Sequence, residues 1–258
     1  MIRRVLVTLL GGAALLYVLV CAFYFCAQGP MIFPAPPGAR ALPAVGTAVR
    51  GEGFRALDAP VAGARGSVVL FHGNAEDLAD AGTMIALWKD LGFSVFAVEY
   101  PGYGIARDLG APSRDAIYAS AERALIWLRE RRPGLLVLQG QSLGGAVAAE
   151  MARRGFGSRL VLVSTFTSLA EAAQRTVPWV PVRPLLRERF DNSAIAGEVQ
   201  MPVLIVHGTL DEVLPVEMAT RLAREFPQAR LQLIAGGHHN DLLSSHLPAL
   251  RSALSSAF

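Results

Sequence analysis

The chain of 258 residues has a formal net charge of +3, with 52% hydrophobic and only 17% charged residues. This composition excludes a largely disordered chain and is sufficient for one compact domain with a substantial core. The arginines are scattered and Lys89 is the only lysine, so the sequence lacks the clustered basic face that nucleic-acid binding requires.

The N-terminal segment, residues 1–27, is predicted to be a transmembrane anchor. Arg3 and Arg4 precede residues 5–27, which carry no charge and are long enough to cross a bilayer as a helix. A cleavable signal peptide is the alternative, but it would have a shorter apolar core and small residues before the cleavage site. Here the segment ends in an aromatic cluster around Tyr24, which is typical of the membrane interface.

Charge predicts the orientation of this anchor. Positive charge before the span and none after it until Arg40 place the N-terminus in the cytoplasm. The folded domain would then lie on the extracytoplasmic side, which is the periplasmic side of the inner membrane if the protein is bacterial. Cys21 and Cys26 both lie in the apolar segment, so no disulfide is expected in the folded domain.

Residues 28–43 are predicted to form a short, stiff linker. The segment is rich in proline, glycine and alanine, and the prolines at positions 30, 34, 36 and 37 are expected to block regular structure. The folded domain is therefore expected to begin at residue 44 and to continue to residue 258.

Residues 44–258 are predicted to fold as one doubly wound α/β domain. Apolar runs alternate with helical patterns, and continuous rather than alternating runs indicate strands that are buried on both faces of a mostly parallel sheet. Ligands of such sheets bind at the carboxyl ends of the strands, so chemistry is expected in the residues that follow each run. The six runs are residues 67–71, 93–98, 135–138, 160–163, 203–206 and 231–234.

The first two runs end in turns that are expected to shape a cleft. After the first run, the backbone N–H of Asn74 is a candidate donor to the negative charge that develops on a substrate carbonyl oxygen. His72 is expected to brace this loop rather than to act as a base. The turn that begins at Glu99 is rich in proline and glycine, and it is expected to form part of the cleft wall.

The third run leads into the sequence Gly-Gln-Ser-Leu-Gly at residues 140–144, followed by a helical pattern. In this context a G-x-S-x-G sequence forms a tight turn that projects the serine hydroxyl into a cleft. Ser142 is therefore predicted to be a catalytic nucleophile, with a purely structural turn as the alternative. The N–H of Leu143, immediately after the nucleophile, is the second candidate oxyanion donor.

Two later strand ends supply an acid and a base. Asp211 follows the fifth run and is predicted to orient a histidine, although a helix cap or turn is the alternative role and Glu212 is a weaker alternative acid. A glycine loop after the sixth run carries His238 and His239, one of which would be the general base. The order Ser142, acid, histidine is the chain order of α/β hydrolases.

The adjacent histidines leave alternatives open, because spacing alone does not settle which ring faces Ser142. A metal site formed by His238, His239 and Asp241 is a competing interpretation, but ligands of suitable spacing are missing elsewhere. No metal and no cofactor are expected, since hydrolysis needs only water as second substrate. His246 is expected to lie on the last helix at the surface.

Five motifs together carry a family resemblance. They are similar to those of membrane-anchored α/β-hydrolase-domain proteins related to acyl-protein thioesterases and to the serine aminopeptidase-like group. This resemblance covers nearly the whole chain after the linker and implies the α/β-hydrolase fold. Similar proteins have their catalytic histidine in an H-N-D sequence, which implies His239 rather than His238. The motifs are HGNAEDL from His72, EYPGYG from Glu99, GQSLGG from Gly140, HGTLDEVLP from His207 and GGHHNDL from Gly236.

The resemblance also implies a short lid, here residues 165–200. Trp179, Val182 and Leu185 are candidates to line an acyl pocket or to touch the membrane, and ordinary packing onto the sheet is the alternative. A short lid leaves an open cleft that can admit an ester on a bulky carrier. Glu99 and Pro101 stand where relatives usually have Asp and Arg, which weakens any transfer of substrate preference.

The sequence therefore predicts a membrane-anchored serine hydrolase that cleaves carboxylic esters or thioesters, of lipid or acyl-protein type, through an acyl-Ser142 intermediate. Amide or peptide hydrolysis by the same residues is one alternative. A non-catalytic membrane-anchored binding protein of hydrolase fold is another, although such proteins usually lose a catalytic residue. The expected partners are a small-molecule, lipid or acyl-carrier ester and the membrane, with no nucleic acid.

Overall fold

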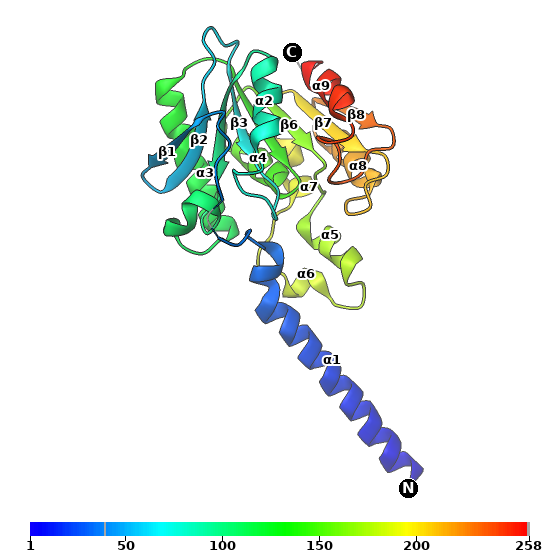
Figure 1. Ribbon diagram of the computed structural model, residues 1–258. Helices are drawn as coiled ribbons and strands as arrows, with labels where there is room; N and C mark the ends of the chain where they lie inside the picture. Colours follow the sequence, from blue (N-terminus) through cyan, green and yellow to red (C-terminus); the bar gives the residue numbers. More distant parts are fainter. Residues whose placement is uncertain (39, 257–258) are drawn as a thin grey trace.

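A single sheet organises the folded part of the chain, and a long helix leads away from it (Figure 1). The computed structural model describes residues 1–38 and 40–256, and within them the sheet has eight strands in the order β1-β2-β4-β3-β5-β6-β7-β8. The strands are β1 (Thr47–Gly51), β2 (Phe54–Ala59), β3 (Ser67–Phe71), β4 (Ser94–Glu99), β5 (Leu136–Gln141), β6 (Arg159–Val163), β7 (Val203–Gly208) and β8 (Ala229–Ile234).

The six predicted strands are all present and pair in parallel, as expected for a doubly wound sheet. Two further strands were not predicted. β1 and β2 form an antiparallel hairpin at one edge, and β2 pairs antiparallel with β4. Neither strand has a continuous apolar run, because β1 is largely exposed at the edge and β2 places an arginine and an aspartate among its buried residues.

Helices cover both faces of the sheet, which explains why the central strands are apolar on both sides. In β3 every residue is buried. The helices around the sheet are α2 (Gly82–Asp90), η1 (Gly104–Leu109), α3 (Arg114–Arg131), α4 (Leu143–Arg153), α8 (Val216–Glu225) and α9 (Leu247–Ser255). Val69 and Phe71 pack in the cluster that includes α3, α4 and α8, whereas Val68 and Leu70 pack in the cluster with α2 and α9.

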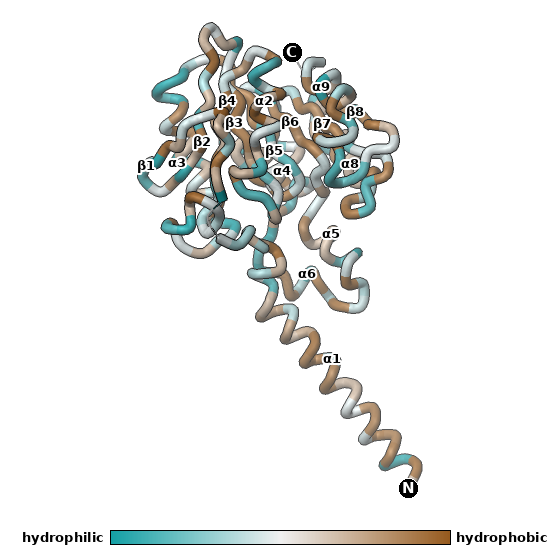
Figure 2. The backbone as a smooth tube through the Cα atoms, in the orientation of Figure 1, coloured by the Kyte–Doolittle hydropathy of each residue, from teal (hydrophilic) through white to brown (hydrophobic). Residues whose placement is uncertain are grey.

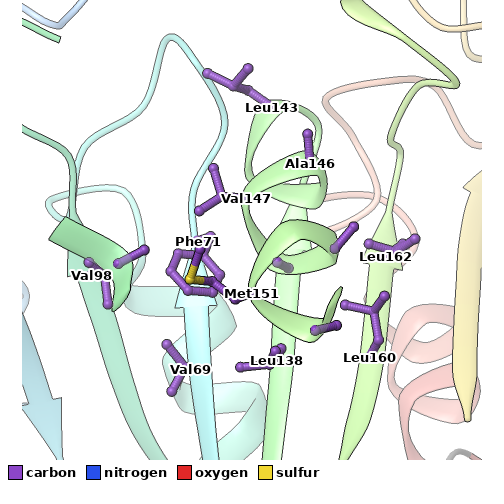
Figure 3. Close-up of a cluster of buried hydrophobic side chains, with 14 of the residues drawn as sticks. Val69, Phe71, Val98, Leu138, Leu143, Ala146, Val147, Met151, Leu160 and Leu162 are labelled. Carbon is purple, nitrogen blue, oxygen red and sulfur yellow. The ribbon is translucent and has the colours of Figure 1, made fainter. Parts of the chain in front are cut away.

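Helix α4 occupies the centre of one face, directly after β5. Figure 3 shows Val147 and Met151 of this helix against Phe71 and Leu138 of the neighbouring strands. Ten of the eleven residues of α4 are buried, so the helix cannot shift without opening the core. Any side chain at its N-terminal end is therefore held in a fixed position relative to the strand ends.

The expectation of burial on both faces was wrong for β8. Of its residues only Ile234 is buried, and Leu233 is 40% exposed. β8 lies at the edge of the sheet, with β7 as its neighbouring strand, and it is less covered than the central strands although α8 and α9 both contact it. An apolar run in sequence does not distinguish an edge strand from a central one.

Helix α1 (Ile2–Ile32) is long and apolar enough to cross a membrane by length and composition, and no residue of its most apolar stretch is buried. Figure 2 shows this apolar helix projecting from the domain. The expectation that Pro30 blocks regular structure from residue 28 onward was wrong for the first part of the linker. Pro30 lies in the last turn, where its missing N–H removes only one helical hydrogen bond, and the Phe33 amide donates to Gly29 O at 2.9 Å.

Residues 165–200 form a short excursion beside the carboxyl ends of the strands. It contains α5 (Leu169–Thr176), α6 (Val182–Leu185), α7 (Asn192–Ile195) and η2 (Ala196–Glu198). In Figure 1, α5 and α6 lie at the same end of the domain as the last turns of α1. This excursion is the segment that the sequence indicated as a lid.

A buried hydrogen bond between a helix and the central sheet gives a first stability prediction. Trp88 of α2 donates from Nε1 to Gln139 Oε1 of β5 at 2.7 Å, and both residues are buried. We expect Trp88→Phe to lower the free energy of unfolding by about 1–3 kcal/mol beyond the effect of ring size, because Gln139 keeps a buried acceptor without a partner.

Trp127→Phe is the matched control for this prediction. Trp127 is partly buried and stacks on Phe96 with ring centroids 5.5 Å apart, but its ring nitrogen has no hydrogen-bond partner among the described residues. Urea unfolding of both variants in detergent micelles would measure the difference. Equal losses would show that ring volume alone accounts for the effect.

Candidate active site

The turn between β5 and α4 holds Ser142 in a strained conformation. Its φ is 50° and its ψ is −115°, a region that residues with a side chain rarely adopt. The Ser142 amide donates to Val163 O at 2.9 Å, and Thr165 Oγ1 donates to Ser142 O at 2.8 Å. These bonds from the neighbouring strand fix the backbone and leave the serine side chain facing the cavity described below.

Close backbone contacts explain the glycines of this turn. A Cβ on Gly140 would lie 2.0 Å from Gly144 O, and one on Gly144 would lie 2.1 Å from Phe71 O. A Cβ on Gly145 would lie 2.4 Å from Thr165 Oγ1. Real Cβ atoms do not approach other atoms so closely, so the turn can form here only with glycine at these positions.

Asp211 lies buried after β7, where its two carboxylate oxygens have separate partners. Oδ1 accepts from the amides of Val213 at 3.0 Å and Leu214 at 2.7 Å. Oδ2 lies 2.8 Å from His239 Nδ1 and 3.3 Å from His207 Nε2. Burial alone would raise the pKa of Asp211, but these hydrogen bonds outweigh it and hold the pKa well below its ordinary value.

The two adjacent histidines have different partners. His239 is buried, bonds through Nδ1 to Asp211, and lines the same cavity as Ser142. His238 is exposed and bonds through Nδ1 to Glu212 Oε2 at 2.9 Å, and this bond raises the pKa of His238. The geometry therefore brings together Ser142, His239 and Asp211, and it places His238 and Glu212 outside the cavity.

The residues of the competing metal interpretation do not converge on one point. The rings of His238 and His239 bond to different carboxylates, and Asp241 Oδ1 accepts from the His238 amide at 2.7 Å. Within the described residues, no group of three histidine, cysteine, aspartate or glutamate side chains is arranged to hold a metal. His246 was expected on the last helix at the surface, but it precedes α9 and its side chain is only 24% exposed.

Both predicted oxyanion donors lie at the cavity. Leu143 is the first residue of α4, where a backbone N–H has no acceptor within the helix. The Asn74 amide has no hydrogen-bond partner among the described residues, while Tyr103 Oη donates to Asn74 O at 2.8 Å. Asn74 also donates from Nδ2 to Ile32 O of α1 at 3.3 Å. The loop is thus fixed on two sides.

A carboxylate that the sequence analysis did not single out connects this loop to the serine turn. Glu76 accepts from the Gly73 amide at 2.8 Å and from Gln141 Nε2 at 3.2 Å, and it lines the cavity. It stands three residues after Gly73, the spacing at which a Glu side chain accepts a bond from a backbone N–H in a capping box. That local spacing is the signal that could have identified it.

His72 braces the loop from beneath, as expected, together with Glu99. Its Nδ1 lies 2.7 Å from Gly73 O, and its Nε2 lies 3.0 Å from Glu99 Oε1. Burial alone would lower the pKa of His72, but the nearby Glu99 carboxylate outweighs burial and raises it. Glu99 is fully buried under the loop and does not line the cavity, so the turn that it begins supports the cleft wall from behind.

The cavity beside Ser142 has a volume of about 480 Å³. Ser142 and His239 both line it, and most of its wall is apolar. Residues 165–200 contribute Phe166, Leu169, Ala172, Ala173, Thr176, Val177, Val180, Val182, Leu185 and Leu186, and helix α1 contributes Tyr24, Gln28, Met31 and Ile32. The contribution of α1 was missed from the sequence, because nothing local shows that a predicted membrane helix packs against residues 165–200.

The glycine contacts generate a second prediction. Gly144→Ala is expected to lower the free energy of unfolding by at least about 2 kcal/mol, because its new Cβ would overlap the carbonyl of Phe71. Gly197→Ala is the control, since a Cβ there meets nothing within 4 Å. Urea unfolding would measure both variants. If Gly144→Ala were as stable as Gly197→Ala, the close packing of the turn on β3 would be wrong.

The pair of His72 and Glu99 generates a prediction of pH dependence. The raised pKa of His72 means that the pair stabilises the fold fully below the unfolded pKa of about 6.5, and that this stability is lost as pH rises through the folded-state pKa. We expect Glu99→Gln to cost about 3 kcal/mol at pH 6, where it leaves a buried imidazolium without its partner. The cost should be smaller at pH 9.

Urea unfolding of wild type and Glu99→Gln at both pH values would check this. The variant keeps an oxygen for the hydrogen bond that the Leu78 amide donates to Glu99 Oε2 at 3.2 Å, so chiefly the charge changes. A cost independent of pH would contradict a charged His72 in the folded protein.

Comparison with known protein families gives one profile match and several relatives. The profile described as serine aminopeptidase, S33, matches residues 62–195. The uncharacterised protein Rv2307c of Mycobacterium tuberculosis is 34% identical over 179 residues, and YfhR of Escherichia coli is 32% identical over 209 residues. Human α/β hydrolase domain-containing protein 17B is 29% identical over 199 residues.

These alignments cover 68%, 77% and 74% of this chain, in the same order. They cover 63% of Rv2307c, which is less than two thirds of its length, 72% of YfhR and 67% of the human protein. The chain therefore spans most, but not all, of the length of each relative.

Two solved structures have a similar backbone. Esterase Pf2001 of Pyrococcus furiosus superposes with a TM-score of 0.70 at 15% identity and covers 86% of this chain and 97% of its own. A monoacylglycerol lipase of Paleococcus ferrophilus superposes with a TM-score of 0.55 at 22% identity, covering 75% of this chain and 95% of its own. At such low identity the likeness concerns the fold.

Proposed function

We propose that this chain, which belongs to the serine aminopeptidase S33 family and has the α/β-hydrolase fold, is a hydrolase that cleaves carboxylic esters or thioesters through an acyl-Ser142 intermediate. One observation carries the proposal. Ser142 and His239 line the same cavity, and His239 Nδ1 lies 2.8 Å from Asp211 Oδ2. A histidine held in this way presents its other nitrogen to a serine proton.

The proposed reaction follows from these positions. Ser142 Oγ attacks the substrate carbonyl while Nε2 of His239 accepts the serine proton, and the ionised Asp211 holds the histidine in the required tautomer. The amides of Asn74 and Leu143 donate to the oxyanion, and each such donor typically contributes about 10²–10³-fold in rate. His239 then protonates the departing alcohol or thiol, and water releases the acid by the same route.

The lining of the cavity supports esters and thioesters with an acyl chain over substrates with a free amino terminus. Most of the wall is apolar, and Glu76 is the only carboxylate among its described residues. Both oxygens of Glu76 accept hydrogen bonds from the protein itself, from Gly73 and Gln141. A single carboxylate that already bonds to two protein groups offers an α-ammonium group little, whereas an acyl chain has a long apolar surface to contact. The similar esterase and lipase folds are consistent with this choice.

The proposal includes a membrane anchor. Residues 1–27 would cross the membrane with the N-terminus in the cytoplasm, residues 28–43 would connect the anchor to the domain, and residues 44–258 would form the catalytic domain with a lid at 165–200. The apolar, unburied helix α1 and the arginines before it support this arrangement. The catalytic domain would then lie on the extracytoplasmic side.

Fluorophosphonate labelling and hydrolysis of p-nitrophenyl esters by the full chain in detergent would test the proposed chemistry. Ser142→Ala should abolish labelling, and both Ser142→Ala and His239→Ala should lower kcat by at least about 10⁴-fold. Asp211→Asn should lose less, because the base and nucleophile remain.

His238→Ala is the matched control, since His238 stands beside His239 in sequence but bonds to Glu212 outside the cavity. It should keep most of the wild-type activity. A Ser142→Ala protein with full esterase activity would overturn the proposed nucleophile. If His238→Ala were inactive and His239→Ala active, the assignment of the base would be reversed.

A further inference from the structure

The last turns of α1 form part of the cavity wall rather than standing apart from the domain. Tyr24, Gln28, Met31 and Ile32 line the cavity that also contains Ser142. In Figure 1, this end of α1 passes beside α6, and the rest of the helix leads away from the domain. A helix that only attached the domain to the membrane would not need to line this cavity, so α1 has a second role.

Gln28 connects this helix to the lid with both ends of its side-chain amide. Nε2 donates to Leu185 O at 3.1 Å, and Oε1 accepts from the Arg187 amide at 2.7 Å. Gln28 is only 6% exposed and is the one buried residue of α1. A buried amide in an apolar helix is costly unless it is bonded, so these two contacts account for its presence.

Aromatic contacts extend the same interface along α1. Tyr17 Oη donates to Trp179 O at 3.0 Å, and the Tyr24 ring meets the Trp179 ring edge to face at a centroid distance of 5.7 Å. Tyr17 and Tyr24 are seven residues apart, which is about 10 Å along a helix. The tip of residues 165–200 therefore runs along the helix, and Trp179 is 55% exposed there.

The other side of the helix end contacts the candidate oxyanion loop. Ile32 O, in the last turn of α1, accepts a hydrogen bond from Asn74 Nδ2 at 3.3 Å. The backbone amide of the same Asn74 is one of the two proposed oxyanion donors. The end of α1 thus lies between the lid and the loop beside the nucleophile, where an acyl chain attached to a carbonyl at Ser142 would pass.

We infer that the C-terminal turns of α1 are a specificity-determining part of the active site: they form the acyl-binding wall, and Gln28 holds the lid against it. The occupant is a single long acyl chain of an ester or thioester, for which the apolar wall and a cavity of about 480 Å³ are suited. This inference rests on the proposed function. Gln28 is a positioning residue that acts through the lid, and Met31 contacts the chain.

Chain-length profiles of the full protein in detergent micelles test this inference. The probes are p-nitrophenyl acetate and p-nitrophenyl decanoate, and the measured quantity is the ratio of their kcat/KM values. Gln28→Leu should lower the decanoate-to-acetate ratio about tenfold, mainly through KM. Leucine cannot bond to Leu185 O or to the Arg187 amide, so the lid should move away from α1 and the acyl-binding wall should open.

A second pair of variants keeps the test valid if Gln28→Leu does not fold. Met31→Trp should fill part of the cavity and lower the same ratio, whereas Cys26→Trp should leave it unchanged, because Cys26 is exposed and does not line the cavity. Fluorophosphonate labelling of Ser142 in each variant shows that the nucleophile is intact.

The outcomes separate the two proposals. Wild-type protein that neither reacts with fluorophosphonate nor cleaves acetate would overturn the proposed function and the inference with it. Wild-type protein that is active, with equal chain-length profiles in Met31→Trp and Cys26→Trp, would overturn the inference alone. A lower ratio in Met31→Trp but not in Cys26→Trp would establish that α1 contacts the acyl chain.

Discussion

The close packing of the turn after β5 on the end of β3 is the constraint on which the rest of the site depends. No Cβ fits on Gly144, because that atom would lie only 2.1 Å from Phe71 O. This contact brings the start of α4 against the strand that leads to the Asn74 loop, so a strained Ser142 and both candidate oxyanion amides meet at one place. The strain is sustained because α4 is almost entirely buried.

Two histidine–carboxylate pairs near this turn, His72 with Glu99 and His239 with Asp211, have different roles. The pair of His72 and Glu99 is buried beneath the loop, and neither residue lines the cavity. The role of this pair is therefore to hold the loop. The pair of His239 and Asp211 places a ring on the cavity wall. Similar chemistry therefore supports structure in one case and the proposed proton transfer in the other, and only position relative to the cavity separates them.

Helix α1 changes how the proposed anchor should be understood. Its end is bonded to the lid through Gln28 and to the loop through Ile32 O, which makes the membrane-proximal end continuous with the cavity. A water-soluble fragment that begins after the linker would lack this wall. The proposed enzyme is thus best regarded as one unit in which attachment to the membrane and recognition of the acyl chain share residues.

The sequence by itself determined the central parallel strands and the candidate residues Ser142 and Asp211, because continuous apolar runs and a glycine-flanked serine are local patterns that bulk and backbone geometry dictate. The family resemblance indicated His239, but only the tertiary structure gave His239 and His238 different partners. It also decided the exposure of β8 and the place of α1 in the cavity wall. These features depend on contacts between segments that are far apart in the sequence. Local composition does not indicate which distant residues will be in contact.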